Sequence, residues 1–101
     1  MRDILYTSQY KRDIKRARRR HLPEEQLDEV IKLLADDQPL PPERRDHALS
    51  GEFRGARECH IHPDWLLIYS KENIRTAGEE GVVEELHILK LLRTGTHSDL
   101  F

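Results

Sequence analysis

The sequence contains a single cysteine, Cys59, among 101 residues, and its longest unbroken apolar run is the five residues 65–69. One cysteine cannot form an intramolecular disulfide bond, which favours a reducing compartment. The apolar run is far shorter than the ~20 residues that cross a membrane as a helix, and the N-terminus lacks the apolar run of a signal peptide. We therefore expect a cytoplasmic protein without a membrane partner.

Apolar residues are scarce at 37%, whereas charged residues reach 36%, against about 25% charged residues in a typical globular domain. Leu, Ile, Val and Phe still provide 26 of the 101 residues, which exceeds the roughly 20% below which chains tend to remain disordered. A chain of this length fits one small folded domain over residues 1–101.

The net charge of −2 conceals an uneven charge distribution. Residues 1–22 carry eight basic and two acidic side chains, whereas residues 23–46 carry eight acidic and three basic ones. A basic segment followed by an acidic one gives a dipolar surface that is able to meet a polyanion on one side. Two solvated helix faces would explain the same charges.

Helical periodicity marks the N-terminal part of the chain. Between Thr7 and His21 the apolar positions fall on one helix face, and Thr7 or Ser8 can cap its start. Pro23 suits the first position of a second helix, which is expected to end before Pro39 and is fully amphipathic. The pattern predicts a helical hairpin.

Strand-like patterns occupy residues 53–61, 65–70 and 82–92, and the glycine-containing segment 70–81 reads as a long hairpin loop. Short strands joined by tight connections are expected to pair antiparallel. The predicted fold is therefore an α+β domain in which the N-terminal helical hairpin packs on one face of an antiparallel β-sheet.

Several of the six histidines stand in contexts that favour function. His60 and His62 lie two apart on a predicted strand and are expected to leave the same face. His47 and His97 lie in loop-like segments, and Arg93 ends the last strand.

Several imidazoles and an arginine suit RNA cleavage by the 2′-hydroxyl of the RNA itself. One imidazole can remove the 2′ proton and another can protonate the departing 5′ oxygen, because the pKa of imidazole, ~6.5, is near working pH. Arginine can stabilise the charge that develops on the phosphate oxygens. Trp65 or Phe101 could stack on an unpaired base. This chemistry uses no metal ion and no cofactor.

A zinc site is the competing chemical interpretation. The His60-x-His62 pair can supply two ligands, and further candidates for the remaining positions are His47, His97, Asp64 and Cys59. The spacing matches no common zinc pattern, and the sequence has no CxxC pair.

Three segments occur in a characteristic order: DHALSG at 46–51, CHIHPDWLLIY at 59–69 and RTGTHSDLF at 93–101. Together they resemble the YafQ family of bacterial toxins, within the wider RelE/ParE group. The resemblance implies a RelE-like, microbial-RNase-like fold with a helical hairpin on a twisted antiparallel sheet. It also implies the toxin of a type II toxin–antitoxin system, an mRNA interferase that cuts mRNA in the ribosomal A site.

The same resemblance assigns roles to particular residues. The catalytic positions that it implies are His47, His60, Asp64, Arg93 and His97, and the aromatic RNA-binding positions are Trp65 and Phe101. Among these we favour His97 as the general acid, because it is adjacent to the Arg93 turn, and His60 or Asp64 as the base. His47 would bind phosphate or share the proton transfer.

The implied partners are the 70S ribosome with its A-site mRNA and a cognate antitoxin, a ribbon-helix-helix DNA-binding protein similar to DinJ. Operator DNA would be reached only through the antitoxin. An alternative with the same fold is a toxin-like protein that acts by binding alone, as the gyrase-inhibiting ParE branch does. The histidine-rich motifs favour the nuclease, since a binding protein needs no proton shuttle.

Overall fold

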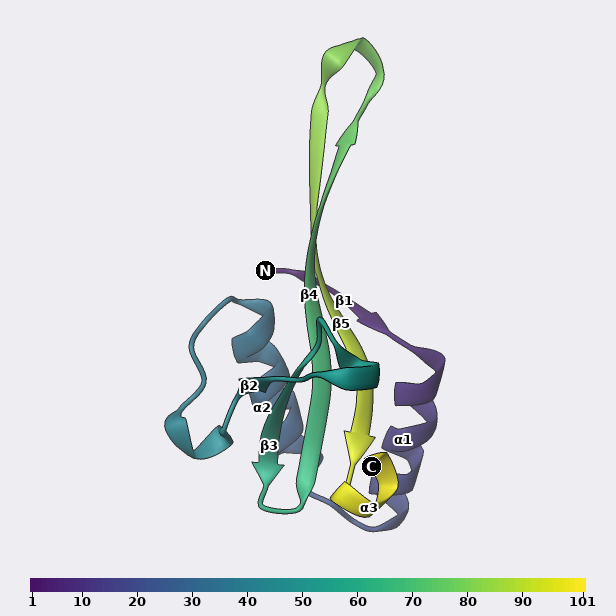
Figure 1. Cartoon of the computed structure of the whole chain (residues 1–101), viewed down its shortest axis with the longest axis vertical. Helices are drawn as coiled ribbons and strands as arrows, with labels where there is room; N and C mark the ends of the chain where they lie inside the picture. The colour runs from purple at the N-terminus through teal and green to yellow at the C-terminus, as the bar shows by residue number, and fades with distance from the viewer.

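The computed structural model describes residues 1–101, apart from the side chain of Glu79. The chain runs in the order β1 (Asp3–Tyr6), α1 (Ser8–Arg19), α2 (Glu24–Ala35), β2 (His47–Ala48), β3 (Arg57–His62), β4 (Trp65–Ala77), β5 (Val83–Gly95) and α3 (His97–Leu100). Single 3₁₀ turns at Pro42–Arg44, Gly51–Phe53 and Glu79–Gly81 complete the connections. Figure 1 shows the sheet with α1 and α2 beside it.

The two predicted helices are confirmed. The Thr7 side chain caps α1 by accepting a hydrogen bond from the Tyr10 N–H at 3.1 Å. In α2 the acidic residues Glu24 and Glu25 occupy the first turn, where the helix dipole favours negative charge. Each helix buries its apolar stripe against the sheet and leaves most of its charged residues toward solvent.

The sheet has the strand order β1-β5-β4-β3-β2. The pairs β3–β4 and β4–β5 are antiparallel, as the sequence predicts. However, β1 pairs parallel to β5, so the sheet is mixed rather than purely antiparallel. The reason is the position of β1: it runs directly into α1, which packs against β5, and so it takes the free edge of that strand.

The prediction of a loop over residues 70–81 is wrong for most of that segment. Strands β4 and β5 continue as a paired ribbon to the cross-strand pair Ala77–Val83, which leaves only residues 78–82 as the turn. We call residues 71–88 the arm. Figure 1 shows the arm projecting beyond the rest of the molecule. With the arm included, the molecule measures 51 Å in its longest dimension and 28 Å in the other two. Cross-strand pairs such as Ile74–Leu86 continue the ladder into this segment.

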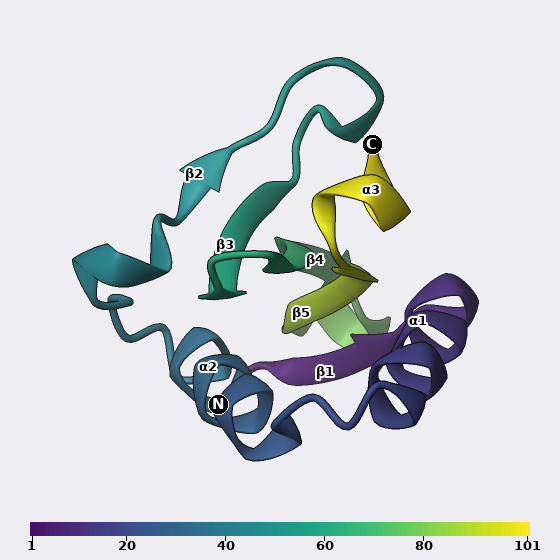
Figure 2. The ribbon, with the colours of Figure 1, turned by 90° about the horizontal axis from the view of Figure 1, so that it is seen from below.

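The sheet separates two apolar clusters; Figure 2 shows α1 and α2 on one side of it and α3 on the other. On the side of α1 and α2, the larger core contains strand residues such as Cys59, Trp65, Leu67 and Leu89. On the opposite side a smaller cluster lies under α3; its buried members are Ala56, Leu66, Ile68 and Leu100. Both faces of the central strands are therefore covered.

Among the residues that the structure describes, no helix is both long enough and apolar enough to cross a membrane.

Candidate active site

Two imidazoles lie beside one another where β3 meets the C-terminal helix. The ring centroids of His60, on β3, and His97, at the start of α3, are 5.9 Å apart, with the rings edge to face at 61°. His60 is largely covered, whereas half of the His97 side chain is exposed. The sequence predicts both residues as site residues, and the fold brings them together from positions 37 residues apart in the chain.

A carboxylate orients His97. Asp64, in the turn between β3 and β4, accepts hydrogen bonds through Oδ1 from the backbone N–H of His97 at 3.1 Å and from its Nδ1 at 2.9 Å. These two bonds lower the pKa of Asp64 below its ordinary value, the side-chain bond being the larger cause. With Nδ1 engaged by the carboxylate, Nε2 is the nitrogen of His97 that can meet a substrate.

The helix that carries His97 is fixed to the rest of the fold. Thr96 and Asp99 form a capping box at the start of α3. The Asp99 carboxylate also pairs with Arg20 at 2.7 Å and with Arg16 at 3.2 Å. The hydrogen bond from Arg20 is the main reason that the pKa of Asp99 lies well below its usual range. The short C-terminal helix is therefore tied to the basic end of α1.

A second carboxylate, Glu58, lies beside His60 and was missed by the sequence interpretation. It is buried on β3 with 4% exposure, and its Oε1 is 3.6 Å from Nε2 of His60 and 3.7 Å from Nε2 of His47. The signal available in the sequence was the spacing of Glu58 and His60, two residues apart on one strand face. Glu58 therefore lies between the imidazoles of His60 and His47, and His47 is at the edge of the cluster.

His47 is the most peripheral member of the cluster. Its Nδ1 lies 2.8 Å from the backbone carbonyl oxygen of Arg45, and its ring is half exposed. The short strand β2 holds it opposite Glu58 in the β2–β3 register. The predicted residue is thus brought to the site, but on its solvent side.

The side chain of Arg93 is engaged by a carboxylate of α1. Its guanidinium donates to the carboxylate of Asp13, on α1, through Nε at 2.7 Å and Nη2 at 3.2 Å. The same carboxylate accepts the backbone N–H of Thr94 at 3.2 Å. Asp13 is buried at 2% exposure and was also missed from sequence. None of the contacts recorded for the described residues joins Arg93 to the imidazoles.

The two predicted RNA-binding aromatics have opposite environments. Trp65 is 1% exposed in the core, and its indole N–H donates to Oγ1 of Thr94 at 2.9 Å. Its predicted role as a stacking platform is wrong for this structure, because neither face of a buried ring can meet a base. Phe101 is 66% exposed and packs edge to face on Phe53, with ring centroids 5.8 Å apart. It remains available to a base.

The metal ligands suggested by the sequence are only partly assembled. Ligand atoms of Glu58, His60 and His97 lie within 4.8 Å of one another, a set that could hold a cation such as Zn²⁺. His62 is not in this group: its ring stacks on Trp65 with centroids 6.1 Å apart. Cys59 faces the core, where burial raises the pKa of its thiol to about 12 and opposes the thiolate that a metal requires.

The geometry as a whole is suited to proton transfer. Two neighbouring imidazoles each have a carboxylate within reach, an arrangement that holds the rings in fixed positions for acid and base roles. Half of the His97 side chain is exposed at the start of α3, so a large substrate can reach it.

Comparisons with known proteins show which family the chain resembles over its whole length. Residues 2–101 match the family described as "Bacterial toxin of type II toxin-antitoxin system, YafQ". The chain is 38% identical over 101 residues to the mRNA interferase toxin YafQ of Escherichia coli K12, covering 99% of this chain and 96% of that one. Among solved structures, the toxin in the E. coli DinJ–YafQ toxin–antitoxin complex is similar with a TM-score of 0.74 and 38% identity, covering 99% of this chain and 97% of that one. A metal-bound toxin from Helicobacter pylori is similar with a TM-score of 0.79 and 33% identity, covering 100% of both chains.

Proposed function

The chain belongs to the YafQ family of type II toxin–antitoxin toxins, and from this premise we propose that it is an mRNA interferase that cuts mRNA in the ribosomal A site. The observation that carries the proposal is the pair of imidazoles, His60 and His97, 5.9 Å apart, with Glu58 and Asp64 beside them. Cleavage by a 2′-hydroxyl needs one proton acceptor and one proton donor near a single phosphodiester, which is what this pair provides.

In the proposed reaction His60 removes the proton of the 2′-hydroxyl. The oxygen attacks the adjacent phosphorus, and the bond from phosphorus to the 5′ oxygen breaks. His97, oriented through Nδ1 by Asp64, donates a proton from Nε2 to the departing oxygen. The products are a 2′,3′-cyclic phosphate and a 5′-hydroxyl end. Asp64 therefore acts by positioning His97, which favours His60 over Asp64 as the base.

The remaining residues predicted for the site take supporting roles in this proposal. His47, exposed beside Glu58, contacts a phosphate of the bound message. Arg93 stabilises negative charge through the N–H groups that Asp13 does not engage. Phe101 stacks on a base of the codon, since exposed aromatic rings are the usual platform for unpaired RNA bases.

The proposed partners are the ribosome, through the basic residues of α1, and a cognate antitoxin of the ribbon-helix-helix class. The antitoxin proposal is supported by the DinJ–YafQ complex, in which a structurally similar toxin is bound to its antitoxin. The ribosome proposal is supported by the charge of residues 1–22, which carry eight basic and two acidic side chains.

The test is cleavage on ribosomes programmed with a defined mRNA, with the new 5′ ends mapped. Wild-type protein should produce ends within the A-site codon, and His97→Ala should produce almost none. His87→Ala is the matched control, because His87 is an exposed histidine on the arm, away from the cluster; it should cleave like wild type. Folded wild-type protein that binds ribosomes but yields no new ends would support the non-catalytic alternative instead.

A further inference from the structure

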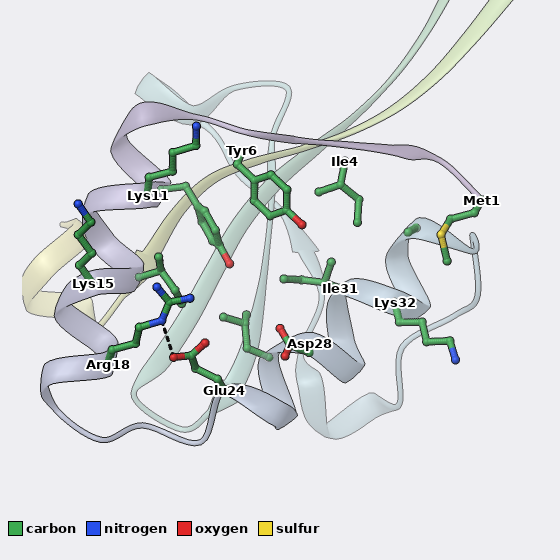
Figure 3. A pocket seen from close by; sticks show the side chains of 14 residues that line it. Met1, Ile4, Tyr6, Lys11, Lys15, Arg18, Glu24, Asp28, Ile31 and Lys32 are labelled. Carbon is green, nitrogen blue, oxygen red and sulfur yellow. Dashed lines mark hydrogen bonds and ion pairs between the residues drawn. The ribbon is translucent and has the colours of Figure 1, made fainter.

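An apolar groove lies between α1, α2 and β1 (Figure 3). Its apolar residues border the larger core, on the side of the sheet opposite α3. It encloses about 590 Å³, which is within the range of ~300–1,000 Å³ that is typical of ligand-binding clefts. The apolar residues that line it come from all three elements: Ile4, Tyr6, Tyr10, Ile14, Leu27 and Ile31.

One wall of this groove is basic. Lys11, Lys15 and Arg18 line it from α1, and Figure 3 shows their side chains along this helix. Arg18 is paired with Glu24 at 2.7 Å, but the ion pairs of the described residues include neither Lys11 nor Lys15. Glu24, Asp28 and Lys32 line the groove from α2, so the excess of cations lies on the α1 side. An apolar groove with cations along one wall fits a segment that combines apolar and acidic side chains.

The turn of the arm is a segment of this kind. Val82 and Val83 are 58% and 62% exposed, and the exposed acidic residues Glu80, Glu84 and Glu85 lie next to them in the chain. A two-stranded ribbon that projects into solvent is marginally stable on its own. A surface that covers the exposed valines would therefore also stabilise the projecting ribbon.

The arm cannot reach the groove of its own chain, because it projects away from the helices (Figure 1). Seven residues of strand, from 71 to 77, span roughly 24 Å at ~3.4 Å per residue. The molecule is 28 Å across in its shorter dimensions, so the arm has the length needed to lie along the body of a neighbouring molecule.

We propose that the tip of the arm of one copy docks in the α1–α2–β1 groove of a second copy, and that the second arm docks reciprocally in the first groove. Val82 and Val83 cover the apolar lining, and Glu84 and Glu85 face the basic wall. Reciprocal docking makes a closed dimer with two-fold symmetry, the commonest form of homo-oligomer. The dimer uses surfaces outside the imidazole cluster, although its groove includes part of the basic face of α1 through which ribosome contact is proposed.

Charge reversal tests this arrangement by sedimentation at several protein concentrations. Wild type should show the mass of two chains at high concentration. The variant Glu84→Lys/Glu85→Lys should be monomeric, with the dissociation constant raised at least ~100-fold, because like charges then face each other. Lys11→Glu/Lys15→Glu should behave in the same way. The control is Glu25→Lys/Glu29→Lys, which changes net charge equally on exposed α2 residues that do not line the groove and should dimerise like wild type.

Mixing the two reversed variants is the decisive step. In the mixture each basic arm meets an acidic groove and each acidic arm meets a basic groove, so a dimer of two different chains should return. All four substitutions are at exposed positions, and unchanged thermal unfolding would confirm that each variant is folded. A wild-type monomer at every concentration, or a dimer that survives both reversals, would overturn the proposal. Sedimentation is measured without ribosomes or message, so neither outcome decides whether the protein cleaves mRNA.

Discussion

The carboxylate of Asp13 on α1 holds the guanidinium of Arg93 on β5 at two points, 2.7 and 3.2 Å, across 80 residues of sequence. It also accepts the N–H of Thr94, whose hydroxyl donates to the carbonyl oxygen of Leu66 at 2.7 Å. One buried side chain therefore fixes the end of β5. Because His97 follows Thr94 by three residues, the position of the proposed acid depends on α1.

Asp13→Asn should weaken this link while preserving side-chain volume. Removing one charge of a largely buried pair typically costs about 3 kcal/mol of unfolding free energy, because the other charge loses its partner. Urea denaturation measures this loss. Single-turnover cleavage should fall while the shape of the pH–rate profile stays that of wild type, since no proton-transfer group is removed. Lys15→Gln on the same helix is the control, and a loss of stability in it similar to that of Asp13→Asn would contradict the interpretation.

Local patterns in the sequence were sufficient for α1 and α2, because the spacing of Tyr10, Ile14 and Ala17 and the Thr7 cap are set by the helix itself. They were insufficient for β1, whose four residues are mostly exposed and pair with a strand more than eighty residues away. They also failed for the arm, where glycines and charges suggested a loop although cross-strand pairing continues through them. Strand pairing depends on contacts that no local pattern contains.

In the candidate site too, local motifs identify some residues and long-range contacts define the others. The histidines and Asp64 were identified by their motifs, but Glu58 and Asp13 are defined by partners that only the fold supplies. Trp65 was assigned to RNA because of its motif. Its spacing to Leu67 and Tyr69, two and four residues on, placed it on the face of β4 that packs in the larger core and was the better guide.

The contrast between Trp65 and Phe101 gives a paired prediction. Trp65→Ala should lower the unfolding free energy by about 3–5 kcal/mol, because a buried aromatic ring and its hydrogen bond to Thr94 are lost. Phe101→Ala should change stability by less than about 0.5 kcal/mol. If Phe101 stacks on a base, the same variant should weaken binding of the programmed ribosome about tenfold. Binding equal to wild type would remove Phe101 from the RNA site.

Zinc should inhibit cleavage rather than support it. Glu58, His60 and His97 can act together as ligands, and a bound ion would occupy both proposed proton-transfer groups. Added Zn²⁺ should raise the thermal midpoint of the free protein and slow cleavage, and a chelator should restore the rate. His60→Ala should lose the thermal shift, whereas His62→Ala should retain it because His62 lies outside the group. Cleavage that is lost in EDTA and restored by zinc, but not by magnesium, would contradict the metal-free mechanism.

The Asp64–His97 contact predicts a specific titration. The hydrogen bonds from His97 lower the pKa of Asp64, so their stabilising contribution is complete above the ordinary pKa of Asp, ~3.9, and is lost as pH falls through the lowered value. Carboxyl NMR should show a lower midpoint for Asp64 in wild type than in His97→Ala. Equal midpoints in the two proteins would mean that the contact is not populated in solution.

The depressed pKa of Asp64 also keeps this carboxylate ionised, and His97 oriented, at neutral pH. His97→Ala should therefore fold, because the side chain is exposed, yet lose cleavage by about 10²–10⁴-fold together with the pH limb of the acid. Arg93→Ala should also be slow but should keep both limbs, because it removes charge stabilisation and not a proton donor. Single-turnover rates with saturating protein isolate the chemical step. If His97→Ala cleaves at the wild-type rate, the assignment of His97 is wrong and His60 becomes the first candidate for the acid.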